Sequence, residues 1–183
     1  MIVITGKFKG RKLESIKSEQ TRPTLARVKE SIFCVIDNEI SGKVCLDLFA
    51  GSGAYGIECL SRGAKFVYFC DQNLECEKVI KRNLKNELND CKIIVSDYVD
   101  AIYSVKEKLD LVFLDPPYDS SFGEKALYLL AKENKLNNGA TIVFEHNNKK
   151  DLQTLPKGCI ISKTKNYGDV VVEFIKFEVG YGR

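Results

Sequence analysis

The sequence predicts an α/β fold: a doubly wound, mostly parallel β-sheet with a C-terminal antiparallel hairpin, preceded by a short N-terminal extension. From residue 43 onward, apolar runs typical of buried strands alternate with segments of helical periodicity. Strands separated by helices pair in parallel through right-handed crossovers. Near the C-terminus, two β-rich runs at residues 159–165 and 170–178 are joined by a short turn at Tyr167-Gly168-Asp169, which requires an antiparallel pair. Together these features are typical of a Rossmann-like fold.

The N-terminal extension is expected to hold a short β-hairpin within residues 1–22 and a helix over residues 24–38. Ile2-Val3-Ile4 is a strand candidate, and Arg11-Lys12-Leu13 can return beside it after two glycines. Beyond Pro23, apolar residues recur at helical spacing. We therefore expect a basic arm and helix at residues 1–40 and a second domain at residues 41–183.

The remaining elements follow in order along the chain. Asn73 is suited to cap a helix that runs to about Leu88, and Ser121 and Glu124 have the spacing of a capping box. Asn138-Gly139 is expected to turn the chain into the fifth strand. The expected strands cover residues 44–49, 65–70, 92–95, 109–114 and 140–145, and the expected helices cover residues 54–62, 73–88 and 121–130.

The composition is that of a globular protein and excludes several classes. Hydrophobic residues make up 44% of the 183 residues and charged residues 29%, close to globular averages. The seven cysteines are odd in number and have no Cys-x-x-Cys spacing, so we interpret them as reduced core residues. The one histidine, His146, rules out a histidine-based metal cluster and is expected in an exposed loop. No apolar run reaches the length of a membrane span, and we expect a cytoplasmic, monomeric protein without metal.

Charge is concentrated at the start of the chain. Residues 1–30 contain eight basic and three acidic side chains, whereas the protein as a whole has a net charge of +3. A basic leader on a slightly acidic body suggests contact with a polyanion; the alternative is a solvated charged face. The leader's candidate phosphate-binding residues are Lys7, Arg11, Lys12, Arg22 and Arg27.

A glycine-rich turn follows the first expected strand of the sheet. Residues 47–56 contain Gly51-Ser52-Gly53-Ala54-Tyr55-Gly56, a G-x-G-x-x-G pattern between an expected strand and an expected helix. Asp71 ends the next strand, 20 residues after Gly51, where a carboxylate can accept both hydroxyls of an adenosine ribose. Asp97, after the third strand, can accept the adenine amino hydrogens or cap the following helix.

Asp47 distinguishes between two nucleoside ligands. A carboxylate just before the glycines would repel the pyrophosphate of NAD but attract an amino-acid ammonium. S-adenosylmethionine carries adenosine at one end and a cationic amino acid at the other, so Asp47 favours this ligand.

A second motif, Asp115-Pro116-Pro117-Tyr118, follows the fourth strand. Two prolines stiffen the turn and leave it with acceptors only. The Asp115 carboxylate and the Pro116 carbonyl can together accept both hydrogens of an aromatic amine, which orients the nitrogen lone pair toward an electrophile. Tyr118 offers a ring face on which a base can stack.

These residues resemble a known family. Residues 47–56 and 115–118 are similar to the cofactor and amine-methylation motifs of class I S-adenosylmethionine-dependent methyltransferases. The whole chain resembles the RsmD-type enzymes, which methylate a guanine exocyclic N2 in bacterial 16S ribosomal RNA. The resemblance includes the opening Gly6-Lys7-x-x-Gly10-Arg11-Lys12-Leu13, then Thr21-Arg22-Pro23-Thr24 and the late Tyr167-Gly168. Family members often have Phe at the position of Tyr118.

The resemblance implies methyl transfer from S-adenosylmethionine to a guanine N2, with the small ribosomal subunit or an assembly intermediate as partner. The expected cofactor residues are Asp47, Phe49, Gly51, Gly53, Asp71 and Asp97. The expected catalytic residues are Asp115, Pro116 and Tyr118. Glu145 is expected at the mouth of the cleft, His146 has no assigned role, and Arg27 can brace the pocket instead of binding RNA.

Three other functions stay open at this point. A DNA or RNA adenine-N6 methyltransferase shares the Asp-Pro-Pro-Tyr motif, but the DNA enzymes usually need a sequence-reading domain for which this chain has no room. An NAD-binding oxidoreductase shares the glycine turn and Asp71. A non-enzymatic RNA-binding assembly factor would retain the basic leader with an inactive pocket. Assays with duplex DNA, ribosomal RNA and small subunits test the adenine methyltransferase. Titration of NAD and S-adenosylmethionine tests the oxidoreductase, and methyl-transfer activity would exclude the assembly factor.

Overall fold

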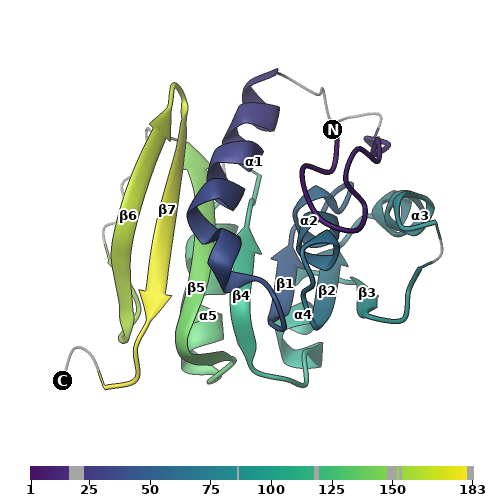
Figure 1. Ribbon diagram of the computed structural model, residues 1–183. Coiled ribbons are helices and arrows are strands. Elements are labelled where there is room, and N and C mark those ends of the chain that lie inside the picture. Colours follow the sequence, from purple (N-terminus) through teal and green to yellow (C-terminus); the bar gives the residue numbers. More distant parts are fainter. Residues whose placement is uncertain (17–22, 86, 118–119, 148–151, 153, 181–183) are drawn as a thin grey trace.

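The protein forms one seven-stranded sheet with helices on both faces (Figure 1). The structure, a computed structural model, describes residues 1–16, 23–85, 87–117, 120–147, 152 and 154–180. Within these residues the strand order is β3-β2-β1-β4-β5-β7-β6. The strands are β1 (Val44–Leu48), β2 (Phe66–Asp71), β3 (Cys91–Val95), β4 (Leu109–Leu114), β5 (Leu136–Asn147), β6 (Cys159–Tyr167) and β7 (Val170–Phe177).

The strand directions confirm the fold class. β1 to β5 pair in parallel. β7 lies between β5 and β6 and is antiparallel to both, so the C-terminal hairpin adds two antiparallel pairings where the sequence indicated one. The outcome is the mostly parallel, doubly wound sheet that the alternation of strands and helices predicts.

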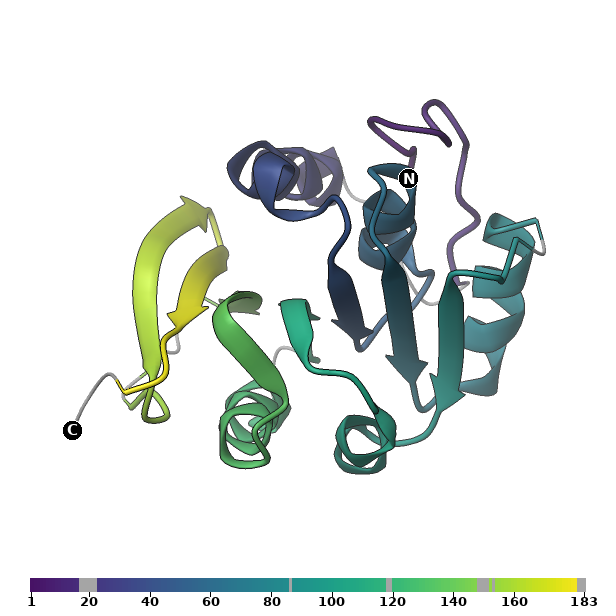
Figure 2. The ribbon, with the colours of Figure 1, turned by 60° about the horizontal axis from the view of Figure 1, so that its bottom comes forward.

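The helices cover the sheet in two layers (Figure 2). One layer is made by α1 (Pro23–Ile36), α2 (Ala54–Ser61) and α3 (Leu74–Asn83), with a short 3-10 turn (Asp37–Glu39) after α1. The other is made by α4 (Tyr98–Ser104) and α5 (Phe122–Lys132). Each layer encloses its own apolar cluster against the sheet. None of the described helices is both long and apolar enough to cross a membrane.

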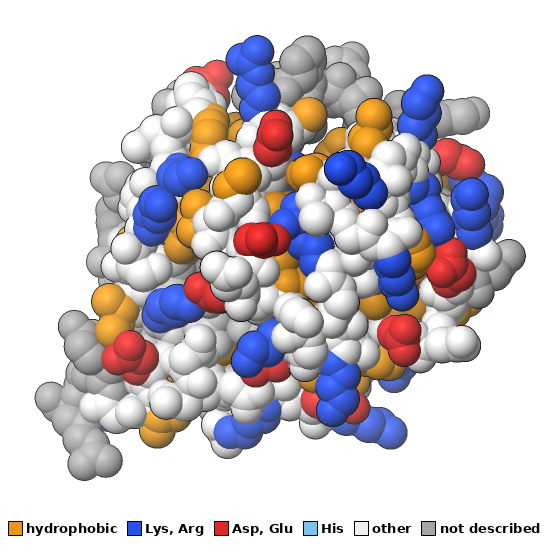
Figure 3. Space-filling view, viewed as in Figure 1, with side chains coloured by type: hydrophobic (Ala, Val, Ile, Leu, Met, Phe, Trp, Pro, Cys, Tyr) orange, Lys and Arg blue, Asp and Glu red, His pale blue; other side chains and the backbone are white. Residues whose placement is uncertain are grey.

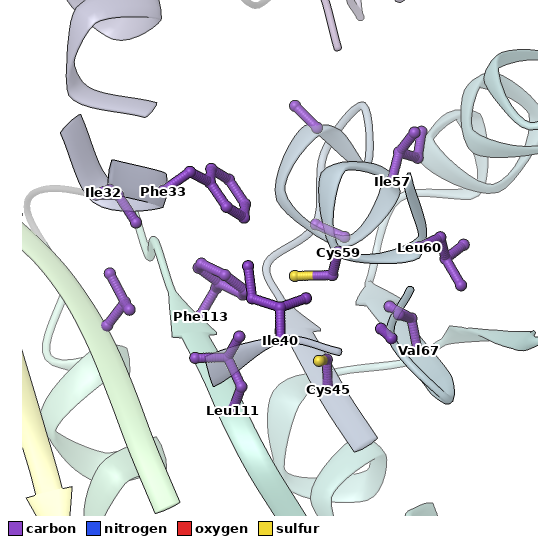
Figure 4. Packing of buried hydrophobic residues seen from close by; sticks show 14 of the residues in the cluster. Ile32, Phe33, Ile40, Cys45, Ile57, Cys59, Leu60, Val67, Leu111 and Phe113 are labelled. Atoms are coloured by element: carbon purple, nitrogen blue, oxygen red, sulfur yellow. The ribbon is translucent and has the colours of Figure 1, made fainter. Parts of the chain in front are cut away.

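The first apolar cluster joins α1 and α2 to the centre of the sheet. Figure 4 shows Phe33 of α1 pointing toward Phe113 of β4, with ring centroids 5.7 Å apart. Cys45 and Cys59 lie in the same cluster. All seven cysteines are free, and five are buried, which confirms the expected core role for those five. Cys34 is exposed and Cys91 is only partly buried, so the expectation was wrong for Cys34. Burial raises the pKa of the Cys70 thiol to about 12, so it stays neutral.

Several expected boundaries were wrong for identifiable reasons. α3 ends at Asn83, not near Leu88, because Lys85 takes a left-handed backbone with φ of 52° and stops the helix. Asn73 caps α3 as expected, accepting a hydrogen bond from the Glu75 amide.

Ser121 precedes α5 but its side chain makes no capping bond. Asn138-Gly139 is an irregularity within β5 where the pairing with β4 shifts register, and β5 begins at Leu136.

The N-terminal arm, residues 1–14, is a compact loop and not a regular hairpin. Its expected strands meet in one antiparallel bridge, between Ile2 and Lys12, and residues 17–22 lie outside the described residues. Val3, Phe8 and Leu13 are at most 6% exposed and belong to the cluster that holds α1 and α2. The arm therefore packs against the rest of the protein through its own apolar side chains.

Gly6 lies where the arm meets the end of α2. Its φ is +86°, and a Cβ added there would lie 1.8 Å from the backbone oxygen of Ser61. Gly10 has nearly the same backbone, with φ of +82°, but a Cβ there would meet nothing within 4 Å. The two glycines therefore differ in their surroundings and not in their conformation.

Gly6→Ala is expected to lower the free energy of unfolding by about 1–3 kcal/mol more than Gly10→Ala. Both substitutions introduce the same kind of backbone strain, so the difference measures the clash with Ser61. Urea denaturation of the two variants tests this. Equal losses of stability would show that the arm does not pack on α2 as described.

Candidate active site

The parallel register brings four chain segments to one edge of the sheet. Leu48 of β1 pairs with Cys70 of β2 and Leu114 of β4, and Asp71 pairs with Val95 of β3. The segments that follow these strands therefore meet at the same edge, as ligand-binding loops do in open α/β sheets. They line a cavity of about 780 Å³.

The glycine turn forms one wall of this cavity. Three of its residues have left-handed backbones: Phe49 with φ of 71°, Gly51 with φ of 51° and Gly53 with φ of 78°. The turn is held by hydrogen bonds from the Ala50 amide to the Cys70 carbonyl and from the Gly53 amide to the Ala50 carbonyl. Phe49 adopts a conformation that costs a non-glycine residue roughly 1–3 kcal/mol, and its side chain lines the cavity.

Asp71 connects the glycine turn to the start of α3. Its Oδ2 accepts a hydrogen bond from the Gly51 amide at 3.0 Å, and its Oδ1 accepts one from the Asn73 amide at 2.9 Å. Both Asp71 and Gly51 line the cavity. Asp71 and Gly51, which are 20 residues apart in the sequence, are therefore in direct contact in the structure.

Asp97 lies on the neighbouring strand end and also lines the cavity. Its Oδ1 accepts hydrogen bonds from the Val99 amide at 2.8 Å and the Asp100 amide at 3.0 Å. These are the bonds of a helix N-cap, so the expected capping role at α4 is confirmed. The expected contact with adenine stays a prediction.

Asp47 does not face the cavity, contrary to the expectation that it meets a ligand ammonium directly. Its side chain is 1% exposed, and its Oδ2 accepts a hydrogen bond from the Gly56 amide at 2.8 Å. Side chains alternate along a strand: Leu46 and Leu48 point toward α4 and α5, so Asp47 points toward α2. The carboxylate stabilises the turn from behind, at the start of α2.

Gly53 also serves the turn instead of lining the cavity. It caps the start of α2, and a Cβ there would lie 3.0 Å from Ile80 Cγ1 and 3.2 Å from Phe69 Cε1. The glycine therefore allows α2 to pack closely on its neighbours.

The Asp-Pro-Pro corner, which follows the neighbouring strand β4, forms another part of the wall. Asp115, Pro116 and Pro117 all line the cavity. Asp115 is partly buried and Pro116 is buried, and Gly123 of α5 has no Cβ to collide with Pro116. Tyr118, to which the sequence assigns a stacking role, lies outside the described residues.

Behind the corner, a buried tyrosine and a buried glutamate are paired. The Tyr55 hydroxyl donates a hydrogen bond to Glu145 Oε2 at 3.1 Å, and the tyrosine ring stacks on Phe113. Burial, together with the charges of Glu145 and Asp115, raises the pKa of Tyr55 well above its usual value. Tyr55 is therefore a neutral hydrogen-bond donor at physiological pH. Glu145 is 2% exposed and lies beneath the corner, not at the mouth of the cleft.

His146 is not in an exposed loop. It belongs to β5, is 7% exposed, and its ring packs on Phe144 with centroids 5.4 Å apart. Its Nε2 lies 3.9 Å from Glu173 Oε1 of β7. The error arose because the strand continues to Asn147, two residues beyond the expected end.

The sequence reasoning missed two aromatic residues that complete the cavity. Tyr98 at the start of α4 lies between Phe49 and Phe122, with centroid distances of 6.0 and 5.5 Å. All three rings line the cavity. Tyr98 and Phe122 share one signal: each is the aromatic first residue of the helix that follows a strand, a position that acidic and glycine motifs do not mark.

The charges of the cavity define the ligand it suits. The described lining residues include three carboxylates, Asp71, Asp97 and Asp115, and no Lys, Arg or His. Such a lining favours a cationic ligand with hydrogen-bond donors and opposes phosphate groups. The described residues contain no cluster of three or more side chains that could hold a metal ion. The cavity therefore suits S-adenosylmethionine through these carboxylates and aromatic rings, and Asp47 does not contribute to its lining among the described residues.

The basic residues of the arm differ in how free they are. Lys7 and Lys12 are exposed, as is Arg27 on α1, and Lys7 Nζ lies 4.7 Å from the Phe8 ring centroid. Arg11 is held in place: its guanidinium carbon lies 3.9 Å from the Phe8 ring centroid, and it donates to the Asn83 carbonyl and to Glu87. Arg22 lies outside the described residues. Figure 3 shows Lys and Arg side chains, interspersed with Asp and Glu, over the arm and α3.

Comparison with known proteins supports the fold and shows the family. The profile of the family described as conserved hypothetical protein 95 matches residues 1–176. Ribosomal RNA small subunit methyltransferase D of Haemophilus influenzae is 38% identical over 177 residues, covering 92% of this chain and 89% of the relative. The solved structure of the putative methyltransferase yhhF from Escherichia coli is 28% identical, with a TM-score of 0.88 over 97% of this chain and 98% of that chain.

A more distant likeness concerns the fold alone. A putative methyltransferase solved in complex with SAH is 15% identical and aligns with a TM-score of 0.63, over 82% of this chain and 48% of that chain. The family profile and the Haemophilus relative each span most of the sequence. The chain therefore belongs to the conserved hypothetical protein 95 family, the RsmD-type methyltransferases that use S-adenosylmethionine.

Proposed function

We propose that the protein transfers a methyl group from S-adenosylmethionine to the exocyclic N2 of a guanine in 16S ribosomal RNA, on the small subunit or an assembly intermediate. One observation supports it most: a glycine turn with Asp71 and an Asp-Pro-Pro corner line one acidic cavity. The name of the Haemophilus relative, a small-subunit ribosomal RNA methyltransferase, supports the choice of RNA.

In this proposal, one group of residues binds the cofactor and another orients the acceptor base. When bound, S-adenosylmethionine supplies an electrophilic methyl group on a sulfonium. Asp71 and Asp97 would hold the adenosine, and Phe49, Tyr98 and Phe122 would exclude water from it.

The corner acts on the acceptor base. The Asp115 carboxylate and the Pro116 carbonyl accept the hydrogens of the guanine amine and direct its lone pair into the cavity. The negative charge of Asp115 stabilises the positive charge that develops on the nitrogen. The guanine must be unpaired or flipped out of a helix to reach the corner.

An assay with isotopically labelled S-adenosylmethionine tests the proposed function. The purified protein is offered small ribosomal subunits from cells that lack it, deproteinised 16S RNA and duplex DNA, followed by nucleoside mass spectrometry. We expect N2-methylguanosine in the RNA and none of the label in DNA. N6-methyladenine as the product would favour the adenine methyltransferase, and absence of transfer to every substrate would favour an assembly factor.

Substitutions at Asp115 and Asp71 are expected to affect catalysis and cofactor binding separately. Asp115→Ala removes the acceptor for the amine and should lower kcat at least about 100-fold, with affinity for S-adenosylhomocysteine changed only a few-fold. Asp71→Ala removes the ribose acceptor and a brace of the turn, and should weaken that affinity at least about tenfold. Calorimetry and initial rates measure both effects.

The control for these variants is Asp100→Ala. Asp100 is exposed on α4 and does not line the cavity among the described residues, so neither affinity nor rate should change. If Asp115→Ala weakened cofactor binding as strongly as Asp71→Ala, the assignment of Asp71 to cofactor binding and Asp115 to catalysis would be wrong.

Lys7 and Lys12 are proposed to bind RNA phosphates, because both are exposed on the arm. Replacing both by Gln should reduce the dependence of log K on log salt by roughly 0.7–0.9 per lost contact. Lys132→Gln, an exposed lysine at the end of α5, is the matched control. If the slope of log K against log salt were the same in all three proteins, the lysines of the arm would contact only solvent and not RNA.

A further inference from the structure

Three buried polar side chains hold the arm to α2 and α3. They are Glu58, Ser61 and Asn83, with exposures of 0%, 4% and 4%. Polar groups are buried at a cost unless they are hydrogen-bonded. Each of these three makes hydrogen bonds with the backbone of the arm, so the buried polar side chains fix this segment in place.

Glu58 fixes the first part of the arm. Its two carboxylate oxygens accept hydrogen bonds from the amides of Ile4, at 2.8 Å, and Thr5, at 3.0 Å. Its charge is balanced by Lys29 Nζ and Arg62 Nε, each 3.0 Å away. A buried carboxylate with this many donors is well compensated.

Ser61 fixes the middle of the arm. Its Oγ accepts a hydrogen bond from the Phe8 amide at 2.9 Å, and its backbone oxygen accepts one from the Lys7 amide at 2.8 Å. These contacts bind the arm to α2 but do not touch the glycine turn.

Asn83 differs from the other two because its amide bonds both the arm and the glycine turn. Its Oδ1 accepts a hydrogen bond from the Glu14 amide at 2.7 Å. Its Nδ2 donates to the Glu14 carbonyl at 3.1 Å and to the Ser52 carbonyl at 3.0 Å. Both donors of the amide are used, one on each segment.

Ser52 lies between Gly51, which lines the cavity and bonds to Asp71, and Gly53. A ligand that settles on Gly51 and Asp71 therefore restrains the Ser52 peptide. Through Asn83 the same restraint reaches Glu14 at the end of the arm. This chain of contacts connects the cavity to the segment that carries Lys7 and Lys12, although the arm itself does not line the cavity.

We propose that Asn83 is a positioning residue that couples the arm to the cofactor cavity, so that cofactor binding and RNA binding strengthen each other. The inference rests on the proposed function, since it takes the cavity as the cofactor site and the arm as an RNA contact. Ordering the turn in advance lowers the entropic cost of ordering the arm. Because binding free energies are linked, each ligand raises the affinity of the other by the same factor.

Amide hydrogen exchange of the unmodified protein tests the coupling without any substitution. S-adenosylhomocysteine is added, and exchange is followed at the amides of Ile4, Thr5, Phe8 and Glu14. We expect exchange at these positions to slow at least about threefold. Unchanged exchange in a protein that demonstrably binds S-adenosylhomocysteine would overturn the proposal.

A binding comparison tests the role of Asn83 itself. Affinity for small subunits from cells that lack the protein is measured with and without S-adenosylhomocysteine. We expect the ligand to raise this affinity at least about fivefold in the unmodified protein, and less than twofold in Asn83→Ala. Ser61→Ala loosens the arm but keeps the bond to Ser52, so it should retain most of the enhancement, as should Asn89→Ala at an exposed asparagine.

The possible results distinguish failure of this proposal from failure of the proposed function. Failure of the unmodified protein to bind S-adenosylhomocysteine overturns both. Binding and methylation with no enhancement, or equal loss of enhancement in Ser61→Ala and Asn83→Ala, overturns the coupling alone. Should Asn83→Ala fail to fold, the exchange measurement on the unmodified protein decides.

Discussion

The parallel register of β1, β2, β3 and β4 is the constraint on which the candidate site depends. The lining residues Gly51, Asp71, Asp97 and Asp115 are far apart in sequence. They meet because each lies at or just after the end of a strand, and these strands end at the same edge. A shift of one residue in β1 would turn Asp47 into the cavity and Leu48 out of the core. The apolar clusters on both faces of the sheet therefore fix the geometry of the site as well as the fold.

The chemistry of the cavity follows from what this register places there. Its described lining has carboxylates and aromatic rings but no basic side chain, so it suits a cationic nucleoside and opposes a dinucleotide phosphate. Positive charge is instead found on the exposed arm, where Lys7 and Lys12 lie. An acidic cavity and a separate basic arm match the two partners of the proposed reaction, since the cofactor is cationic and the RNA anionic.

The sequence predicted elements well because their signals are local. Apolar runs marked the strands of the parallel sheet, Asn73 marked the start of α3, and the strand-end motifs marked Gly51, Asp71 and Asp115. It could not place side chains whose partners are distant in sequence. Glu58 and Asn83 bond to the arm across 54 and 69 residues, and no local pattern reveals this. Alternation along β1 does indicate that Asp47 points away from the cavity, whereas the charge of Asp47 alone does not reveal its direction.

A crystal structure of the protein with S-adenosylhomocysteine tests the central claim most directly. The account predicts the ribose hydroxyls on Asp71, the adenine near Asp97 and Tyr98, and the sulfur facing the Asp115-Pro116 corner. Density elsewhere on the molecule, an empty cavity, or a sulfur pointing away from that corner would contradict it.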